Sequence, residues 1–111
     1  ESQRKRCSFM ETVVRELEFV QTEVINIRAE DIPAIQEGQF DAVSFRAVSS
    51  LNQCLTLGER FVAPGGKLIV KKPPEDSPAR QEFSLSLKDD ISITSYQGLV
   101  SRLLIYEKCF T

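Results

Sequence analysis

The chain contains no histidine and no tryptophan, and it has only three cysteines and five glycines among its 111 residues. Without histidine, a Ser-His hydrolase site and a Cys-His nucleophile are excluded. Cys7, Cys54 and Cys109 stand far apart and form no C-x-x-C pair, so we expect no metal site. Their odd number and wide spacing favour a reducing, cytoplasmic location in which they act as small hydrophobic residues.

The sequence also lacks a long apolar run and an excess of basic charge. No segment approaches the ~18 apolar residues of a membrane-spanning helix, and no signal-peptide pattern is present, so we expect no membrane partner. The 14 basic and 16 acidic residues give a net charge of -2, so any contact with RNA must use a local patch. A hydrophobic content of 41% with 27% charged residues is typical of one small globular domain.

Helical and strand patterns alternate along the first two thirds of the chain. Apolar residues recur at helical spacing from Gln3 to about Phe19, which predicts an amphipathic helix. Val24–Ile27, Phe40–Phe45 and Lys67–Lys71 are short and rich in β-branched or aromatic residues, which predicts three strands. Phe40–Phe45 is apolar on both faces, as a strand covered by helices on both sides requires.

Turn and capping signals separate these elements. Ser50-Leu51-Asn52-Gln53 has the S-x-x-Q form of a capping box and predicts a helix start, with Ser49 or Ser50 as the cap. Leu51, Cys54, Leu55 and Gly58 would line the apolar face of this helix. The sequence Pro64-Gly65-Gly66 predicts a tight turn that ends it.

The last third is predicted to contain one helix and two strands. Pro73 and Pro74 exclude regular structure, and Ser77-Pro78 resembles the start of a helix that runs to about Lys88. Ile91–Tyr96 and Leu103–Lys108 are expected to form an antiparallel pair at the sheet edge. The alternation of strands and helices predicts an α/β fold with a mainly parallel sheet.

Several short motifs together carry a resemblance to a known family. They are Glu1, Ile27-Arg28-Ala29-Glu30, Phe40-Asp41-Ala42-Val43-Ser44-Phe45-Arg46-Ala47, Pro64-Gly65-Gly66-Lys67-Leu68 and Arg102-Leu103-Leu104-Ile105-Tyr106-Glu107-Lys108. F-D-x-V and P-G-G-x-L occur throughout class I methyltransferases, whereas the combination of R-A-E, S-x-R-A and the closing basic strand is more discriminating. In this combination the chain resembles the ribosomal RNA small-subunit methyltransferase G family, also called glucose-inhibited division protein B.

The resemblance implies a fold and an activity. The fold is a Rossmann-like class I methyltransferase sheet, mostly parallel with an antiparallel terminal strand pair. Residues 1–111 would form a partial domain that lacks the family's first strand and glycine-rich loop. The implied reaction transfers a methyl group from S-adenosylmethionine to N7 of a guanine in small-subunit (16S) ribosomal RNA. Without the glycine-rich loop, we expect the 111 residues alone to bind the cofactor weakly and to be inactive.

The resemblance also assigns cofactor-binding residues. Glu1, at the end of the family's second strand, would accept hydrogen bonds from the ribose hydroxyls. Ala29 and Glu30 follow a predicted strand and would contact adenine. Simpler interpretations stay open: Glu1 as a frayed charged terminus, and Glu30 as an acid at the start of a helical turn.

Three arginines are the candidate RNA-binding residues. Arg46 ends an apolar strand, where open α/β sheets bind ligands, and its guanidinium can hold a carboxylate, a phosphate or a guanine edge. Arg46 is therefore a candidate for the cofactor as well as for RNA. Arg28 occupies the equivalent end of the preceding predicted strand, and Arg102 begins the last one. A surface salt bridge is the alternative role for Arg46, and a solvated strand start is the alternative for Arg102. Lys71 with Lys72 reads best as a solvated pair that can reach phosphate.

Other classes of protein and other roles remain open. The chain fits a non-catalytic fragment or interaction module, or another Rossmann-type nucleotide binder such as a dehydrogenase. Tyr96 and Tyr106 are expected in the core or at the sheet edge and not as base-stacking platforms. If the first family strands are absent, the exposed edge would close by direct pairing of Val24–Ile27 with Phe40–Phe45, or through a homodimer.

Overall fold

The computed structural model describes residues 1–46, 50–72, 78 and 80–110. The chain divides into two compact units, Glu1–Ala34 and Ile35–Thr111, which we call the N-terminal and C-terminal units and describe separately. No helix in the described part of the chain is long and apolar enough to cross a membrane.

The N-terminal unit begins with helix α1, Arg4–Glu16, which confirms the predicted amphipathic helix. The helix ends three residues earlier than expected, because Glu18 adopts a positive φ of 56° that no helix can continue. Cys7 is buried on this helix and Cys54 is buried in the C-terminal unit, whereas Cys109 is exposed. The 3-10 helix η1, Ala29–Asp31, follows, and the 3-10 helix η2, Ala34–Gln36, spans the boundary between the two units.

The predicted strand Val24–Ile27 is wrong, because this segment does not belong to any sheet. It pairs with the backbone of Glu1 instead. The Glu1 ammonium group donates to the Ile25 carbonyl at 3.4 Å, and the Ile27 N–H donates to the Glu1 carbonyl at 3.1 Å. These two bonds have the pattern of a single step of a parallel ladder, and a strand requires several consecutive steps.

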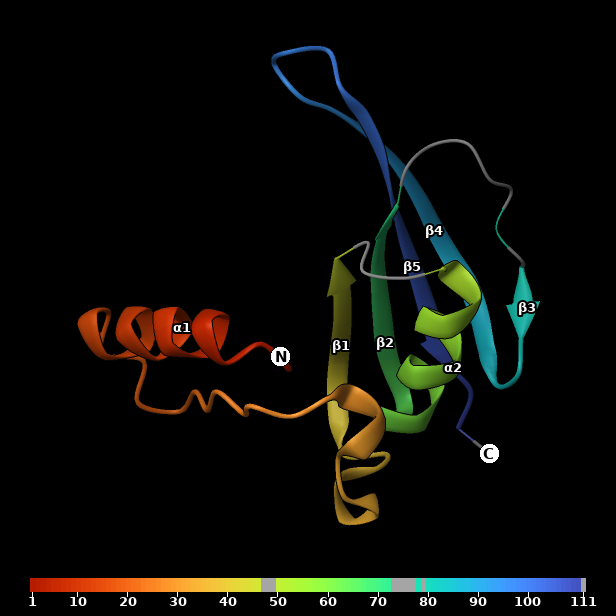
Figure 1. The fold of residues 1–111 in the computed structure, drawn as a ribbon. Helices are drawn as coiled ribbons and strands as arrows, with labels where there is room; N and C mark the ends of the chain where they lie inside the picture. Colours follow the sequence, from red (N-terminus) through yellow and green to blue (C-terminus); the bar gives the residue numbers. More distant parts are fainter. Residues whose placement is uncertain (47–49, 73–77, 79, 111) are drawn as a thin grey trace. The chain divides into compact units, whose positions relative to one another are not determined.

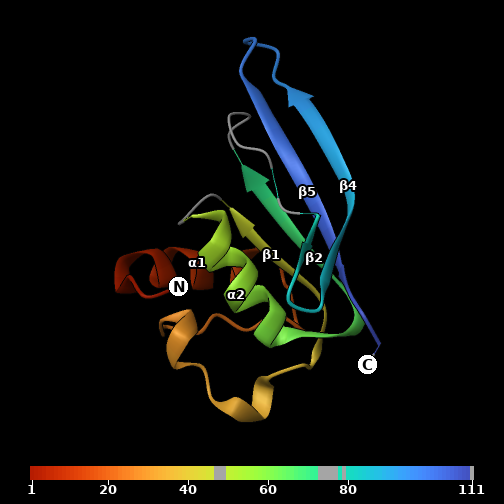
Figure 2. The ribbon, with the colours of Figure 1, turned by 90° about the vertical axis from the view of Figure 1, so that its right-hand side faces the viewer.

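The C-terminal unit is a five-stranded sheet with helix α2, Leu51–Phe61, lying across one face (Figures 1 and 2). The strands, in the spatial order β1-β2-β5-β4-β3, are β1 Phe40–Arg46, β2 Val62–Lys72, β5 Val100–Lys108, β4 Leu85–Thr94 and β3 Gln81–Glu82. Only the β1–β2 ladder is parallel among those of the described residues. The predicted α/β class and the terminal antiparallel pair are confirmed, and the expected mainly parallel sheet is instead mixed. The predicted place of this pair at the sheet edge is wrong, because β5 lies between β2 and β4 and the short β3 forms the edge.

Helix α2 begins where its capping box predicts. The Ser50 hydroxyl accepts a hydrogen bond from the Gln53 N–H at 3.2 Å, while Ser49, the alternative cap, lies outside the described residues. The buried face of α2 packs on a core of Val62, Leu68, Val70, Leu85, Leu104 and Tyr106. A methyl group at Gly58 would lie 2.4 Å from Cδ2 of Leu68, so this glycine lets the helix approach the sheet closely.

The segment Pro64-Gly65-Gly66 is part of β2 and not the predicted turn. Phe40 pairs with Val62 and Ala42 with Lys67, so residues 63–66 form a bulge opposite a single residue of β1. Gly65 supplies a positive φ of 80°, and a Cβ at Gly66 would lie 2.9 Å from the backbone oxygen of Asp41. The glycines therefore serve strand pairing within β2.

The predicted helix from Ser77 to Lys88 is wrong. Ser77, like Pro73 and Pro74, lies outside the described residues, and β3 with the first half of β4 occupies the rest. Ser84-Leu85-Ser86-Leu87 alternates polar and apolar residues, and Leu85 is fully buried in the sheet core. This alternation has the period of a strand, and it extends β4 six residues before the predicted start.

Strand β1 lies at the edge of the sheet and pairs with β2. The predicted pairing of Val24–Ile27 with Phe40–Phe45 is therefore wrong. The expected burial of both faces of β1 is also wrong, because Val43 and Phe45 are half-buried and the other residues of the strand are exposed. A homodimer through this edge stays a prediction.

Candidate cofactor and RNA site

The carboxyl ends of β1 and β2 bring two cationic side chains together. Arg46 is the ladder partner of Lys71, and paired positions of neighbouring strands project from the same face of a sheet. Both side chains are exposed, and neither has a hydrogen bond or ion pair within the described residues. Two unneutralised cations side by side repel each other, so this end of the sheet favours an anionic ligand.

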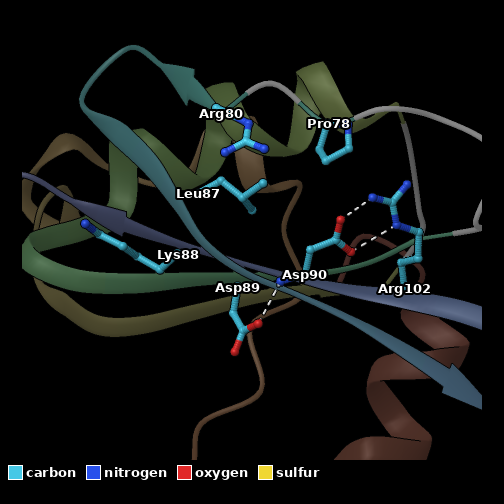
Figure 3. A pocket seen from close by; sticks show the side chains of 7 residues that line it. All are labelled: Pro78, Arg80, Leu87, Lys88, Asp89, Asp90 and Arg102. Atoms are coloured by element: carbon cyan, nitrogen blue, oxygen red, sulfur yellow. Dashed lines mark hydrogen bonds and ion pairs between the residues drawn. The ribbon is translucent and has the colours of Figure 1, made fainter.

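Arg102 lies at the same end of the sheet but on the other face. Its ladder partner is Lys72, one position beyond Lys71, and successive residues of a strand point to opposite faces. Its guanidinium makes a bidentate ion pair with Asp90, in which Nε donates to Oδ1 at 3.0 Å and Nη2 donates to Oδ2 (Figure 3). This hydrogen bonding holds the pKa of Asp90 below its usual range.

The ion pair changes the interpretation of Arg102. Only 19% of its side chain is exposed, and its planar donor edge is occupied by the carboxylate. The structure thus brings Arg46 and Arg102 to one end of the sheet without placing them on one face. Asp90 was not among the predicted site residues, although an acid and a base on the two arms of a hairpin are a recognisable signal.

An open depression of about 500 Å³ surrounds this ion pair. It is lined by Pro78, Arg80, Leu87, Lys88, Asp89, Asp90 and Arg102 (Figure 3). Three basic and two acidic side chains line it, so it has no strong charge of one sign. No group of His, Cys, Asp or Glu side chains in the described segments could hold a metal ion.

Glu1 is held as an ionised acceptor in the N-terminal unit. Its Oε2 accepts a hydrogen bond from the Gln3 N–H at 2.9 Å, and its Oε1 lies 3.8 Å from Nη1 of Arg6. The Gln3 hydrogen bond, followed by the Arg6 charge, lowers the pKa of the Glu1 carboxyl. A carboxylate can accept up to about four hydrogen bonds, so capacity remains for hydroxyl donors.

Arg28, Ala29 and Glu30 follow the segment that pairs with Glu1. Arg28 Nε lies 3.4 Å from Oε2 of Glu30, and both side chains are more than half exposed, so this pair contributes little stability. Ala29 is half-buried and begins η1. These residues belong to the N-terminal unit and Arg46 with Arg102 to the C-terminal unit, so their assembly into one site stays a prediction.

The two tyrosines differ from each other. Tyr106 is fully buried in the core, where burial raises the pKa of its phenol, which confirms the expected core position. Tyr96 is 96% exposed and lies in a turn after β4, so its predicted place in the core or at the sheet edge is wrong. Its position in a turn after alternating β4 residues was the signal that it would be solvent-facing.

The fold is that of a methyltransferase-like α/β protein. It superposes on a putative methyltransferase, yhhF, from Escherichia coli with a TM-score of 0.75 and 16% sequence identity. The match covers all of this chain and 62% of the other.

Sequence comparison identifies the family within this class. The model of the family described as rRNA small subunit methyltransferase G matches residues 1–101. The chain is 32% identical over 100 residues to the ribosomal RNA small subunit methyltransferase G of Mesoplasma florum, which covers 89% of this chain and 42% of that protein. It is 39% identical over 75 residues to the enzyme of the same name from Mycoplasma capricolum, covering 68% and 32%. The chain belongs to the ribosomal RNA small subunit methyltransferase G family and spans less than half the length of these relatives.

Proposed function

We propose that the protein is an S-adenosylmethionine-dependent methyltransferase that modifies N7 of a guanine in small-subunit ribosomal RNA. Residues 1–111 are then part of its class I methyltransferase domain. The family membership supports the reaction over a dehydrogenase or a non-catalytic module. The observation that carries the proposal is the exposed Arg46 guanidinium, without a partner among the described residues, at the carboxyl end of a parallel strand pair beside Lys71.

The N-terminal unit has groups that fit the nucleoside end of the cofactor. Glu1 is an ionised carboxylate with acceptor capacity for ribose hydroxyls, and the small Ala29 side chain permits close approach of an adenine ring to the backbone. S-adenosylmethionine, when bound, supplies a methyl group on a positively charged sulfur. The 111 residues contain no G-x-G-x-G segment, so we propose that a strand and glycine-rich loop outside them hold its methionine end.

The proposed reaction requires the guanine and the methyl donor to be aligned, and it requires no proton transfer by the protein. Guanine N7 has a lone pair and carries no proton, so its methylation requires no general base. This fits a chain without histidine. Arg46 can donate to the guanine O6 or to a neighbouring phosphate, and Lys71 can neutralise a second phosphate. The guanidinium of Arg102 is hydrogen-bonded to Asp90. Its main role is therefore to stabilise this end of the sheet, and RNA binding is secondary.

Substitution of Arg46 tests this function in the full-length protein. Arg46→Ala should lower kcat/KM for methylation of 16S ribosomal RNA by about 10- to 100-fold, because a lost arginine contact costs ~1–3 kcal/mol. Separate KM values for RNA and for S-adenosylmethionine will tell which ligand Arg46 holds. Arg15→Ala, which removes an exposed guanidinium from α1, is the matched control and should behave as wild type. Full activity of a folded Arg46→Ala variant would contradict the proposal.

A further inference from the structure

Strands β4 and β5 continue past the rest of the sheet as a hairpin. The last ladder pair that β2 contributes is Lys72 with Arg102, whereas β4 and β5 stay paired through Thr94 and Val100. We call residues 93–101 the arm. Figures 1 and 2 show the arm projecting beyond the carboxyl ends of β1 and β2, the ends that carry Arg46 and Lys71.

The arm is exposed and uncharged. Every residue from Lys88 to Val100 is exposed, and no residue from Ile91 to Ser101 carries a charge. At its tip, Tyr96 is 96% exposed and Leu99 is 69% exposed. Packing in the core of the protein therefore does not account for the apolar side chains of Tyr96 and Leu99 at this position.

Local hydrogen bonds give the tip a defined conformation. The Ser95 N–H donates to the Leu99 carbonyl at 2.8 Å, and the Gly98 N–H donates to the Ser95 carbonyl at 2.9 Å. The Leu99 N–H also donates to the Ser95 hydroxyl at 3.1 Å, and Gly98 supplies a φ of 82°. The amide of Gln97 donates to the phenol oxygen of Tyr96 at 3.3 Å. The tip thus presents an aromatic ring on an ordered turn.

The chemistry around the arm fits single-stranded RNA. Arg46 and Lys71 form a cationic pair at the end of the sheet from which the arm projects, and they complement a phosphate backbone. An exposed aromatic ring can stack on an unpaired base of a single strand. The arm has no negative charge that would repel the phosphates of that strand. Serine and threonine alternate with isoleucine along β4, so Ile91 and Ile93 project from one face and Ser92 and Thr94 from the other.

We propose that the arm binds an unpaired strand of the substrate RNA, with Tyr96 stacking on a base while Arg46 and Lys71 contact the phosphates. This inference rests on the proposed function for the identity of the RNA. It assigns to Tyr96 a contact that is independent of salt, and to Lys71 a contact that depends on salt.

Equilibrium binding of RNA to the full-length protein without cofactor tests the inference. The probes are a fluorescein-labelled unstructured RNA of about 12 nucleotides, within the usual length of a single-strand site, and the same sequence as a duplex. Tyr96→Ala should weaken binding of the single strand by about 5- to 100-fold and leave the slope of log Kd against log salt unchanged. Lys71→Ala should reduce that slope by about one. Tyr96→Phe keeps the ring and should bind as wild type.

The outcomes separate this inference from the proposed function. Unchanged single-strand affinity of a folded Tyr96→Ala variant overturns the role of the arm, even if the wild-type protein methylates 16S ribosomal RNA. Tyr96-dependent binding by a protein that methylates no RNA supports the arm and overturns the proposed activity. If light scattering shows that Tyr96→Ala changes the oligomeric state while RNA affinity is unchanged, the arm contacts a second copy of the chain and the inference is wrong.

Discussion

Strands β4 and β5 pass through two environments, the sheet core and the arm. In the core they bury Leu85, Leu104 and Tyr106 beneath α2, whereas in the arm the same ladder continues with the exposed β4 residues Ile93 and Thr94. A net backbone hydrogen bond contributes only about 0.5–1.5 kcal/mol, which roughly matches the entropy cost of ordering one residue. The core half therefore supplies stability, and the arm is free to serve contact with another molecule.

The largest contrast is expected from truncating one apolar side chain in each half. Leu104→Ala should destabilise the protein by about 2–5 kcal/mol, because Leu104 is 1% exposed and its loss leaves a cavity. Ile93→Ala should cost less than about 1 kcal/mol, because Ile93 is 40% exposed. Urea unfolding followed by circular dichroism measures both. Equal costs would show that the arm contributes to the core.

A smaller effect is expected where α2 meets the core half. Gly58→Ala should destabilise by about 1–3 kcal/mol, because the added methyl group meets Leu68 at 2.4 Å and overpacks the core. Helix propensity alone would predict a gain of ~1 kcal/mol, so the sign of the change identifies the packing effect. Asn52→Ala, at an exposed position of α2, is the control and should not destabilise the protein. A stabilised Gly58→Ala variant would mean that the helix can shift away from β2.

The smallest effect is expected at the junction between the two halves, where Asp90 binds Arg102. Because Arg102 lowers the pKa of the folded-state Asp90, the ion pair stabilises the protein above the ordinary aspartate pKa of about 4 and is lost as pH falls through the lowered value. Asp90→Asn should therefore lower the Tm at pH 7, and the difference from wild type should shrink below pH ~4.

Calorimetry from pH 7 to pH 2.5 measures this difference. Asp89→Asn is the matched control, because its side chain accepts a hydrogen bond from the Asp90 N–H and an amide oxygen can do the same. A Tm difference for Asp90→Asn that is equal at pH 7 and pH 3 would mean that the carboxylate charge is not what stabilises the junction.

Predictions from local pattern succeeded where one short signal determines an element. The capping box at Ser50 located α2, and the apolar run at Phe40 located β1. Prediction failed where pairing over a distance decides the structure. Val24–Ile27 has the composition of a strand, but it finds one ladder step with Glu1. The bulge at Pro64-Gly65-Gly66 exists only because β1 lies alongside, so its glycines were interpreted as a turn.

The candidate site shows the same division. The exposure of Arg46 at a strand end followed from the order of apolar and charged residues in β1. The engagement of Arg102 by Asp90 depends on the register of the β4–β5 hairpin, and the predicted hairpin began too late along the chain to include Asp90. Tyr96 was assigned to the core or the sheet edge by residue type, whereas the length of the β4–β5 hairpin determines that it lies beyond the sheet.

Helix α2 and strand β2 share Val62, which is both the C-cap of the helix and the first residue of the strand. No linker separates the two elements, so the chain has no slack at this point. One inserted residue would turn the helix by about 100° and carry Cys54 and Leu55 off the sheet. The position of α2 along the sheet is therefore fixed by the register of β2. At the tip of the arm an added residue displaces nothing that is buried, so the fold tolerates a change of length there, at the expense of the turn that orients Tyr96.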